Sequence, residues 1–157
     1  MGDVHSPEIR SKNMRAIRQK NTRPEIVVRC FLHARGFRFR LHSKQLPGTP
    51  DIVLPKYRAV IFVHGCFWHG HNCPLFKLPQ TRTEFWLKKI EANRKRDQRV
   101  IDLIHDTGWR TLIIWECALR KNGARKSMEL LASTVAMWLT GQGKSGEVTD
   151  DQCFHQY

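Results

Sequence analysis

Apolar residues recur at helical spacing in three stretches of the chain. The first begins at Thr22-Arg23-Pro24-Glu25, where Thr22 is suited to cap the helix and Glu25 stands at the capping-box position. Gly36 ends this stretch, and Gly108 ends the second, much longer one. The predicted helices therefore cover residues 22–35, 83–107 and 127–139.

Between these helices lie shorter apolar segments typical of strands. Residues 37–41 alternate apolar and basic positions, which predicts a strand with one positively charged face. Continuous apolar runs predict three more strands, at residues 51–54, 59–63 and 109–115. This order of elements predicts an α/β fold in one domain, 1–157, with a mixed β-sheet flanked by helices on both faces. The Gly-rich, polar segment 141–157 is expected to be a loose tail.

Charge narrows the choice of partner. The 157-residue chain carries 27 Lys and Arg against 14 Asp and Glu, a formal net charge of +13, so a polyanion is the expected partner. No apolar run approaches the ~20 residues of a membrane span, which favours nucleic acid over a membrane. The first residues lack the apolar core of a signal peptide, so a cytoplasmic location is expected. Residues 1–20 form a short basic helix or arm that either contacts DNA or remains a frayed, solvated end.

The segment after the third predicted strand contains several residues that could bind a metal ion. Cys66, His71 and Cys73 lie close together, and Cys117 ends the fourth predicted strand. Three thiolates and one imidazole suit a closed, tetrahedral, structural zinc site. The alternative is a set of buried cysteines beside solvated histidines. A cytoplasmic chain with an odd number of cysteines argues against a disulfide framework.

His64 and His69 remain free beside that metal set. Histidine exchanges a proton near neutral pH, so either could act as a general acid or base. Phe67 and Trp68 are adjacent on a polar loop, and on a basic protein such a pair favours stacking on bases or wedging into a duplex. The alternative is a loop that folds back and buries one ring.

Two carboxylates have open interpretations. Asp51 stands at the mouth of a buried apolar strand, where it either caps a turn after Pro50 or binds a cation. Glu25 is either a plain capping-box carboxylate, which the sequence favours, or a carboxylate near a metal. Asn93 and Asp97 interrupt the apolar stripe of the long helix and could be hydrogen-bonded core groups.

The chain contains four motifs: Pro50-Asp51, the block His-Gly-Cys-Phe-Trp-His that begins at His64, Thr83-Glu84-Phe85-Trp86, and Trp115-Glu116-Cys117. Together they resemble the very short patch repair (Vsr) mismatch endonucleases. The resemblance runs from about Ser11 to Leu119 and weakens in the C-terminal part.

The resemblance implies a restriction-endonuclease-like fold and a bacterial enzyme that acts on the nucleoid. The implied activity is a Mg2+-dependent nick in double-stranded DNA, 5′ to the thymine of a T:G mismatch that arises by deamination of 5-methylcytosine. This nick would start very short patch repair. The implied enzyme is a monomer, and mismatch-repair proteins are candidate partners.

The resemblance also assigns roles to individual residues. It implies Asp51 and the backbone carbonyl of Val63 as Mg2+ ligands, His69 as general base or acid, and Glu25 and His64 as active-site helpers. It implies Cys66, His71, Cys73 and Cys117 as structural zinc ligands. It implies DNA contacts for an aromatic wedge formed by Phe67, Trp68 and Trp86. Three further implied DNA contacts are Lys89, Asn93 and Met14.

The chain departs from the wider fold family at the third strand. Nucleases of this fold usually carry an acidic residue and a lysine two apart, where this chain has Val63 and Gly65. The Vsr group shares this departure, which makes the reaction depend on His69. Gly70 and Asn72 stand where some members have further histidines, which leaves His71 as the zinc ligand.

Two other functions remain open. One is a non-catalytic, zinc-stabilised module that binds distorted or mismatched DNA. The other is a zinc hydrolase that uses the loop metal directly, which would require an open coordination position rather than four protein ligands.

Overall fold

A mixed β-sheet forms the centre of the molecule. The computed structural model describes residues 6–120, 125–150 and 154–156. Within these ranges six strands form one sheet in chain order, β1-β2-β3-β4-β5-β6. The first three strands and the β5–β6 pair are antiparallel, whereas β3–β4 and β4–β5 are parallel. The strands are β1 (Arg40–Leu41), β2 (Ile52–Leu54), β3 (Ala59–His64), β4 (Arg110–Trp115), β5 (Ser145–Val148) and β6 (Phe154–Gln156).

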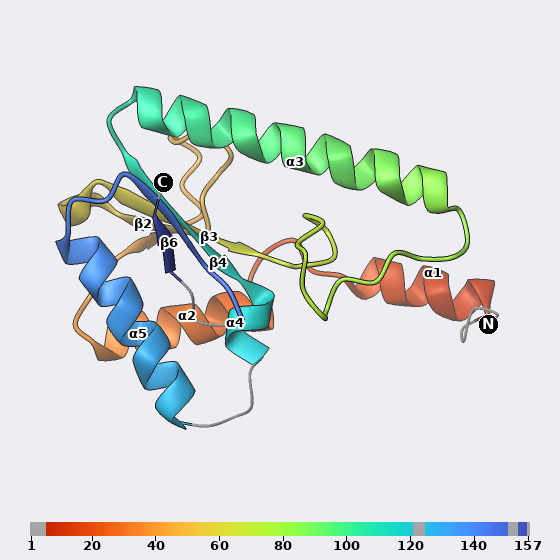
Figure 1. The fold of residues 1–157 in the computed structure, drawn as a ribbon, viewed down its shortest axis with the longest axis horizontal. Helices are drawn as coiled ribbons and strands as arrows, with labels where there is room; N and C mark the ends of the chain where they lie inside the picture. The colour runs from red at the N-terminus through yellow and green to blue at the C-terminus, as the bar shows by residue number, and fades with distance from the viewer. Residues whose placement is uncertain (1–5, 121–124, 151–153, 157) are drawn as a thin grey trace.

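Helices cover both faces of this sheet (Figure 1). One face carries α2 (Arg23–Ala34), the short α4 (Glu116–Arg120) and α5 (Arg125–Thr140), and the other carries α3 (Thr83–Asp106). A one-turn 3-10 helix, η1 (Pro55–Tyr57), joins β2 to β3. The predicted mixed sheet with helices on both sides is therefore confirmed.

Strand β3 shows how the sequence produces two cores. Ala59 and Ile61 pack with α2 and α5, whereas Val60 and Phe62 pack with α3. Successive side chains of a strand point to opposite faces, so a strand covered on both sides must be apolar at nearly every position. This explains why the sequence shows a continuous apolar run here rather than an alternating one.

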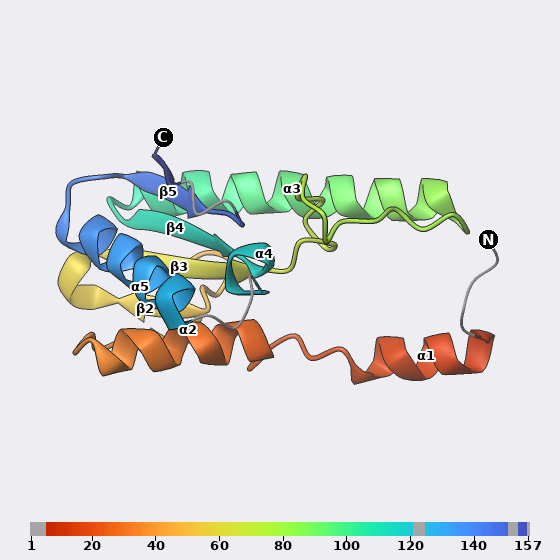
Figure 2. The ribbon, with the colours of Figure 1, turned by 60° about the horizontal axis from the view of Figure 1, so that its bottom comes forward.

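Two helices extend beyond the same end of the sheet. Figure 2 shows α1 (Pro7–Ala16) and the N-terminal half of α3 projecting in one direction, near the loop that follows β3. Every residue of α1 is exposed or nearly so, and Ser6 caps its N-terminus. The basic segment is thus helical over residues 7–16. Among the described residues, no helix has the length and apolar composition that a bilayer span requires.

The predicted helix and strand limits hold to within a residue or two except in two places. The first predicted strand, 37–41, is only Arg40–Leu41. Phe37 instead packs into the core in a coil, with its ring 5.6 Å from that of Tyr57. His42 has a φ of 46°, in the left-handed region, which ends the strand.

The predicted loose tail is wrong for residues 145–148 and 154–156. β5 pairs in parallel with β4 and antiparallel with β6. Gly146 and Val148 are buried, whereas Ser145 and Glu147 are half-buried. The sequence does not mark this strand by apolar alternation, because one of its two buried positions is a glycine, Gly146. Within the segment 141–157, residues 151–153 and 157 lie outside the described part of the chain.

Candidate active site

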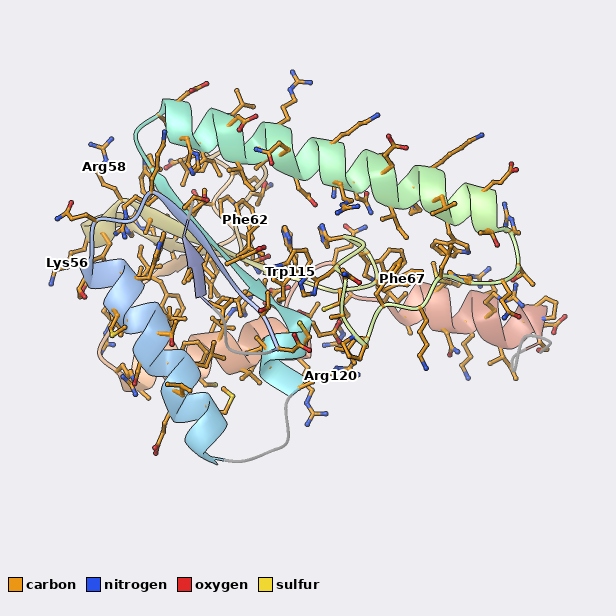
Figure 3. All side chains as sticks on the ribbon, in the orientation of Figure 1. Lys56, Arg58, Phe62, Phe67, Trp115 and Arg120 are labelled. Carbon is orange, nitrogen blue, oxygen red and sulfur yellow. The ribbon has the colours of Figure 1, made fainter. Side chains whose placement is uncertain are left out.

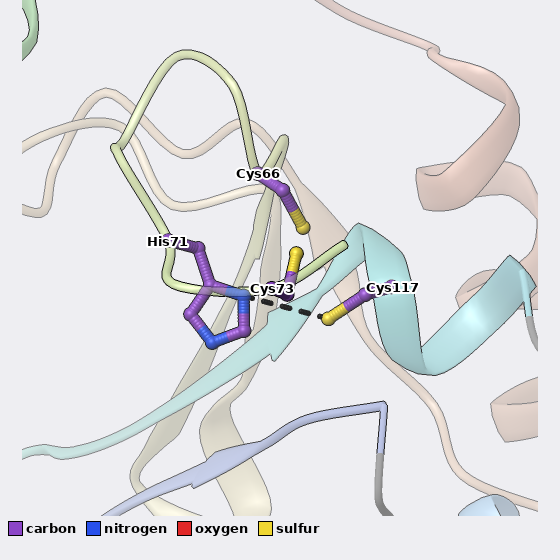
Figure 4. Close-up of side chains that lie close together, drawn as sticks. All are labelled: Cys66, His71, Cys73 and Cys117. Carbon is purple, nitrogen blue, oxygen red and sulfur yellow. Dashed lines mark hydrogen bonds between the residues drawn. The ribbon is translucent and has the colours of Figure 1, made fainter. Parts of the chain in front are cut away.

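The four residues predicted as zinc ligands lie together. Cys66, His71 and Cys73 come from the loop after β3, and Cys117 comes from the first turn of α4 (Figure 4). Their ligand atoms all lie within 4.8 Å of one another, and Cys117 Sγ is 3.5 Å from His71 Nδ1. Three sulfurs and one imidazole nitrogen make a complete tetrahedral donor set. The residues therefore fit a structural metal ion.

One thiol of this cluster, that of Cys117, readily loses its proton. The hydrogen bond from Cys66 and, to a smaller extent, the nearby His71 lower the pKa of Cys117 to about 6, against the effect of burial. The same hydrogen bond, together with burial, raises the pKa of Cys66. A thiolate is the form that binds metal, so Cys117 is the sulfur that is already closest to the ligand state.

Asp51 lies at the start of β2 and points toward β3. Its Oδ2 accepts a 2.8 Å hydrogen bond from the backbone N–H of Val63. Burial and, to a smaller extent, the neighbouring Glu25 carboxylate raise the pKa of Asp51 to about 6, although the Val63 hydrogen bond lowers it. A carboxyl with this pKa is destabilised in its charged form and gains from a nearby cation. The two residues implied as Mg2+ ligands, Asp51 and Val63, are thus direct neighbours.

Glu25 is the capping carboxylate that the sequence favoured. Its Oε1 accepts from the Thr22 hydroxyl at 3.1 Å, and its Oε2 accepts from the Asn21 N–H at 3.0 Å and from Arg29 Nη2 at 2.8 Å. The side chain is only 4% exposed. The predicted helix start is confirmed, because the Thr22 hydroxyl accepts from the backbone N–H of Glu25. Glu25 also forms, with His42 and Asp51, a group whose ligand atoms lie within 4.8 Å of one another and could hold a metal ion.

His42 and Arg29 complete this side of the site, and no sequence pattern pointed to either. Arg29 Nη2 lies 3.0 Å from His42 Nε2, and His42 Nδ1 lies 4.0 Å from Asp51 Oδ1. Burial lowers the pKa of His42 more than the Glu25 charge raises it, so the ring is neutral at physiological pH. Because arginine only donates, a neutral His42 accepts from Arg29 at Nε2 and carries its proton on Nδ1, toward Asp51.

His64, at the end of β3, and His69, in the loop that follows, stack on each other. The rings of His64 and His69 lie 3.8 Å apart at an interplanar angle of 1°, and His69 Nδ1 is hydrogen-bonded to a carboxylate oxygen of Asp97 on α3. Burial lowers the pKa of His64 to about 3, so this ring stays neutral. Burial acts to raise the pKa of Asp97, but the His69 hydrogen bond and nearby charges outweigh it, so the pKa is lowered.

This trio suits proton transfer better than metal binding. Its ligand atoms are close enough for a metal, but an imidazole binds an ion in the plane of its ring, and two parallel rings cannot both aim at one ion. A histidine oriented by a carboxylate is instead the arrangement of a general base or acid. Asp97 is hydrogen-bonded, as its place in an apolar stripe indicates, and its partner is the candidate base His69.

Gly70 allows the loop to bring His69 against α3. Its φ is +61°, and an added Cβ would lie 2.6 Å from Ile90 Cγ2. A larger residue with the same backbone would push the loop away from α3, and with it the bond between His69 and Asp97.

Three aromatic side chains form a cluster next to the histidines. Phe67 lies 5.2 Å from both Trp68 and Trp86, and the two tryptophans are 6.0 Å apart, measured between ring centroids. All three are half-buried. Neither Phe67 nor Trp68 is fully buried, so the structure leaves the predicted wedge open. In Figure 3 Phe67 lies in the loop beyond the end of the sheet.

One cleft joins most of these groups. It has a volume of about 910 Å³, and among its lining residues are Met14, Glu25, His42, Asp51, Val63, His64, Trp68, His69, Lys89, Asn93 and Asp97. Met14 is 42% exposed in the arm, and Asn93 Nδ2 donates to the backbone carbonyl of Trp68 at 2.9 Å. Phe67 and Trp86 contact Trp68 but do not line the cleft themselves. The structure therefore places four of the six predicted DNA contacts around the predicted catalytic residues.

Comparisons of the sequence with a family profile and with known proteins agree with one another. A family profile described as DNA mismatch endonuclease Vsr matches residues 2–75. The chain is 49% identical to the DNA mismatch endonuclease Vsr of Escherichia coli (strain K12), over 99% of this chain and 98% of that protein. It is 56% identical to the type II nicking enzyme V.XorIIP of Xanthomonas oryzae pv. oryzae, over 79% of this chain and 91% of the relative. It is also 43% identical to the type II nicking enzyme V.NmeAIP of Neisseria meningitidis, over 76% and 86%.

Proposed function

Because the chain belongs to the Vsr family of DNA mismatch endonucleases, we propose that it nicks double-stranded DNA 5′ to the thymine of a T:G mismatch. Such a mismatch arises by deamination of 5-methylcytosine, and the nick starts very short patch repair in the bacterial cytoplasm. The observation that carries this proposal is the single cleft shared by Asp51, the His64–His69 pair and the Trp68 side of the aromatic cluster. The mixed sheet with Asp51 at a strand end supports a restriction-endonuclease-like fold.

The proposed chemistry is hydrolysis of one phosphodiester bond. Mg2+ held by Asp51 and the Val63 carbonyl would neutralise charge on the scissile phosphate and make a bound water more acidic. His69 takes a proton from the attacking water or gives one to the leaving oxygen. Asp97 fixes the orientation of His69 and stabilises its protonated form. His64, neutral and buried, holds the His69 ring in place by stacking.

The arm and the N-terminal half of α3 are proposed to hold the duplex between them (Figure 2). The net charge of +13 supplies the attraction to phosphates. A mismatched pair is easier to unstack than an intact one, so the Phe67, Trp68 and Trp86 wedge meets less resistance there. Lys89 and Asn93 lie on the cleft side of α3, next to the wedge, and Met14 approaches from the arm.

The cysteine cluster is proposed to hold a structural zinc ion. Four protein donors close the coordination sphere, which opposes the zinc-hydrolase alternative. The cluster would keep the loop in shape, so that His69 faces the phosphate. The protein is proposed to act as a monomer, with mismatch-repair proteins as candidate partners.

The test is strand-specific nicking of end-labelled duplexes that differ at one base pair. A T:G duplex should be cut once, 5′ to the thymine, in Mg2+, and matched C:G and T:A duplexes should resist cleavage. Equal cleavage of matched DNA would refute mismatch repair, and activity in zinc alone would favour the hydrolase. If Asp51→Ala nicked at the wild-type rate, the assigned metal site would be wrong. Tight binding of T:G DNA without any nick would indicate the non-catalytic binder.

A further inference from the structure

One indole ring touches both the cysteine cluster and the histidine pair. Trp115, the last residue of β4, stacks on His71 with ring centroids 4.2 Å apart and an interplanar angle of 10°. The same ring meets His64 at 5.4 Å and His69 at 6.2 Å, nearly perpendicular to both. Trp115 is 8% exposed and packs with Cys66 and Cys117. It lies at the end of the strand, facing the loop after β3 (Figure 3).

The orientation of this ring is set by a residue on β5. Trp115 Nε1–H donates a 2.9 Å hydrogen bond to Glu147 Oε2. Glu147 lies on β5, opposite Ile113 of β4 in the parallel register. A buried indole N–H needs an acceptor, and a carboxylate is a strong one. The bond therefore fixes the rotation of the indole about its side-chain bonds, which stacking alone leaves free.

We propose that Trp115 is a positioning residue shared by the cysteine cluster and the two histidines, and that Glu147 holds it in place. For its catalytic part the proposal rests on the proposed nuclease function. Through Glu147, β5 then helps to support the active site, although the sequence predicts a loose tail in this segment. Neither Trp115 nor Glu147 lines the cleft, so both act through other groups.

The contacts of the Trp115 ring depend on its orientation. If the Glu147 acceptor is removed, the buried indole N–H is left unsatisfied, and the ring gains by turning toward another acceptor or toward water. Turning would break the parallel stack on His71 and change the edge contacts with His64 and His69. A displacement of about 1 Å at a catalytic group can cost ~100-fold in rate, so a partial effect of ~10-fold is expected here.

The test compares Glu147→Gln, which keeps an acceptor oxygen, with Glu147→Leu, which does not. Trp115→Phe keeps a ring without the N–H and serves as a second variant should Glu147→Leu fail to fold. Glu129→Leu is the control, because it removes a carboxylate at an exposed position of α5, away from the site. Four quantities are measured on the zinc-loaded protein: the indole N–H signal of Trp115 by NMR, the rate of zinc release to a chelating dye, the single-turnover nicking rate, and the Kd for DNA.

For Glu147→Leu we expect a displaced Trp115 indole signal, faster zinc release, and nicking slowed ~10-fold while the Kd for DNA changes less than about twofold. Glu147→Gln should restore most of each value, and Glu129→Leu should match the wild type. Trp115→Phe should release zinc faster than the wild type.

Wild-type zinc release and nicking in Glu147→Leu would overturn the proposal, as would equal losses in Glu147→Gln and Glu147→Leu. Wild-type zinc release in Trp115→Phe would overturn it as well. If the wild type does not nick T:G DNA at all, the proposed function fails, and the NMR signal and zinc release still decide the role of Glu147.

Discussion

Replacing Asp51 by asparagine should make the metal-free protein more stable while it abolishes nicking. Burial and the Glu25 carboxylate raise the pKa of Asp51 from its usual 3.8 to about 6. A shift of about two units corresponds to ~3 kcal/mol of unfavourable free energy when the carboxyl is charged. An asparagine side chain would keep the acceptor for the Val63 N–H without the charge. The gain in unfolding free energy should therefore be between ~1 and ~3 kcal/mol at about pH 8.

The stability that Asp51→Asn gains over the wild type should disappear in acid, because the pKa of Asp51 is raised in the folded state. Between about pH 6 and pH 3.8 the folded state binds a proton at Asp51 that the unfolded state does not, so protonation progressively stabilises the wild type as the pH falls. At about pH 4 the difference between the two proteins should be less than ~1 kcal/mol. Mg2+ should stabilise the wild type and leave Asp51→Asn unchanged, because a ligand stabilises only the state that binds it.

The assay is urea unfolding of both proteins at the two pH values, in buffer without Mg2+ and in buffer with Mg2+, with Glu129→Gln as the control for loss of an exposed carboxylate. A variant that is less stable than the wild type at about pH 8 would refute the reasoning, because Asp51 would then stabilise the fold in its charged form. Equal stabilisation of both proteins by Mg2+ would show that the ion binds elsewhere.

Three further predictions concern other parts of the molecule. Asp97→Asn should lower the nicking rate at least ~100-fold with little change in DNA affinity, because His69 loses the carboxylate that stabilises its protonated form; single-turnover kinetics measure this. Cys117→Ser should purify with less than one zinc per chain and melt at a lower temperature, measured by metal analysis and calorimetry. Arg110→Met should cost at least ~2 kcal/mol in urea unfolding, because Arg110 donates to the carbonyls of Gly143 at 2.7 Å and Leu139 at 3.0 Å.

What the sequence predicted well was local. The helix start at Thr22 and Glu25 uses residues three apart, and the apolar runs of β2, β3 and β4 are visible without any partner. The cysteine cluster could be anticipated because three of its donors lie within eight residues, and Cys117 is marked by its place at a strand end. In each case the information lies in spacing along the chain.

What the sequence did not reveal depends on contacts between distant segments. Asp97 bonds to a histidine 28 residues earlier, and a polar residue in an apolar stripe shows only that some partner exists. His42 lies beside Asp51 because β1 and β2 pair antiparallel with Leu41 opposite Ile52, a register that the sequence does not reveal. β5 has little apolar character of its own and exists as a strand because β4 offers it an edge.

The order of residues in the loop after β3 explains why two chemistries can share it. Along the chain the two sets are interleaved: His64 and His69 belong to one, and Cys66, His71 and Cys73 belong to the other. Cys66, His71 and Cys73 turn toward Cys117 on α4, whereas His64 and His69 turn toward Asp97 on α3. Cys66 and His71 therefore each fix the backbone within two residues of a histidine that faces the cleft. A loop fixed this way holds His69 by its neighbours, so the sequence needs no regular secondary structure there to keep the base in place.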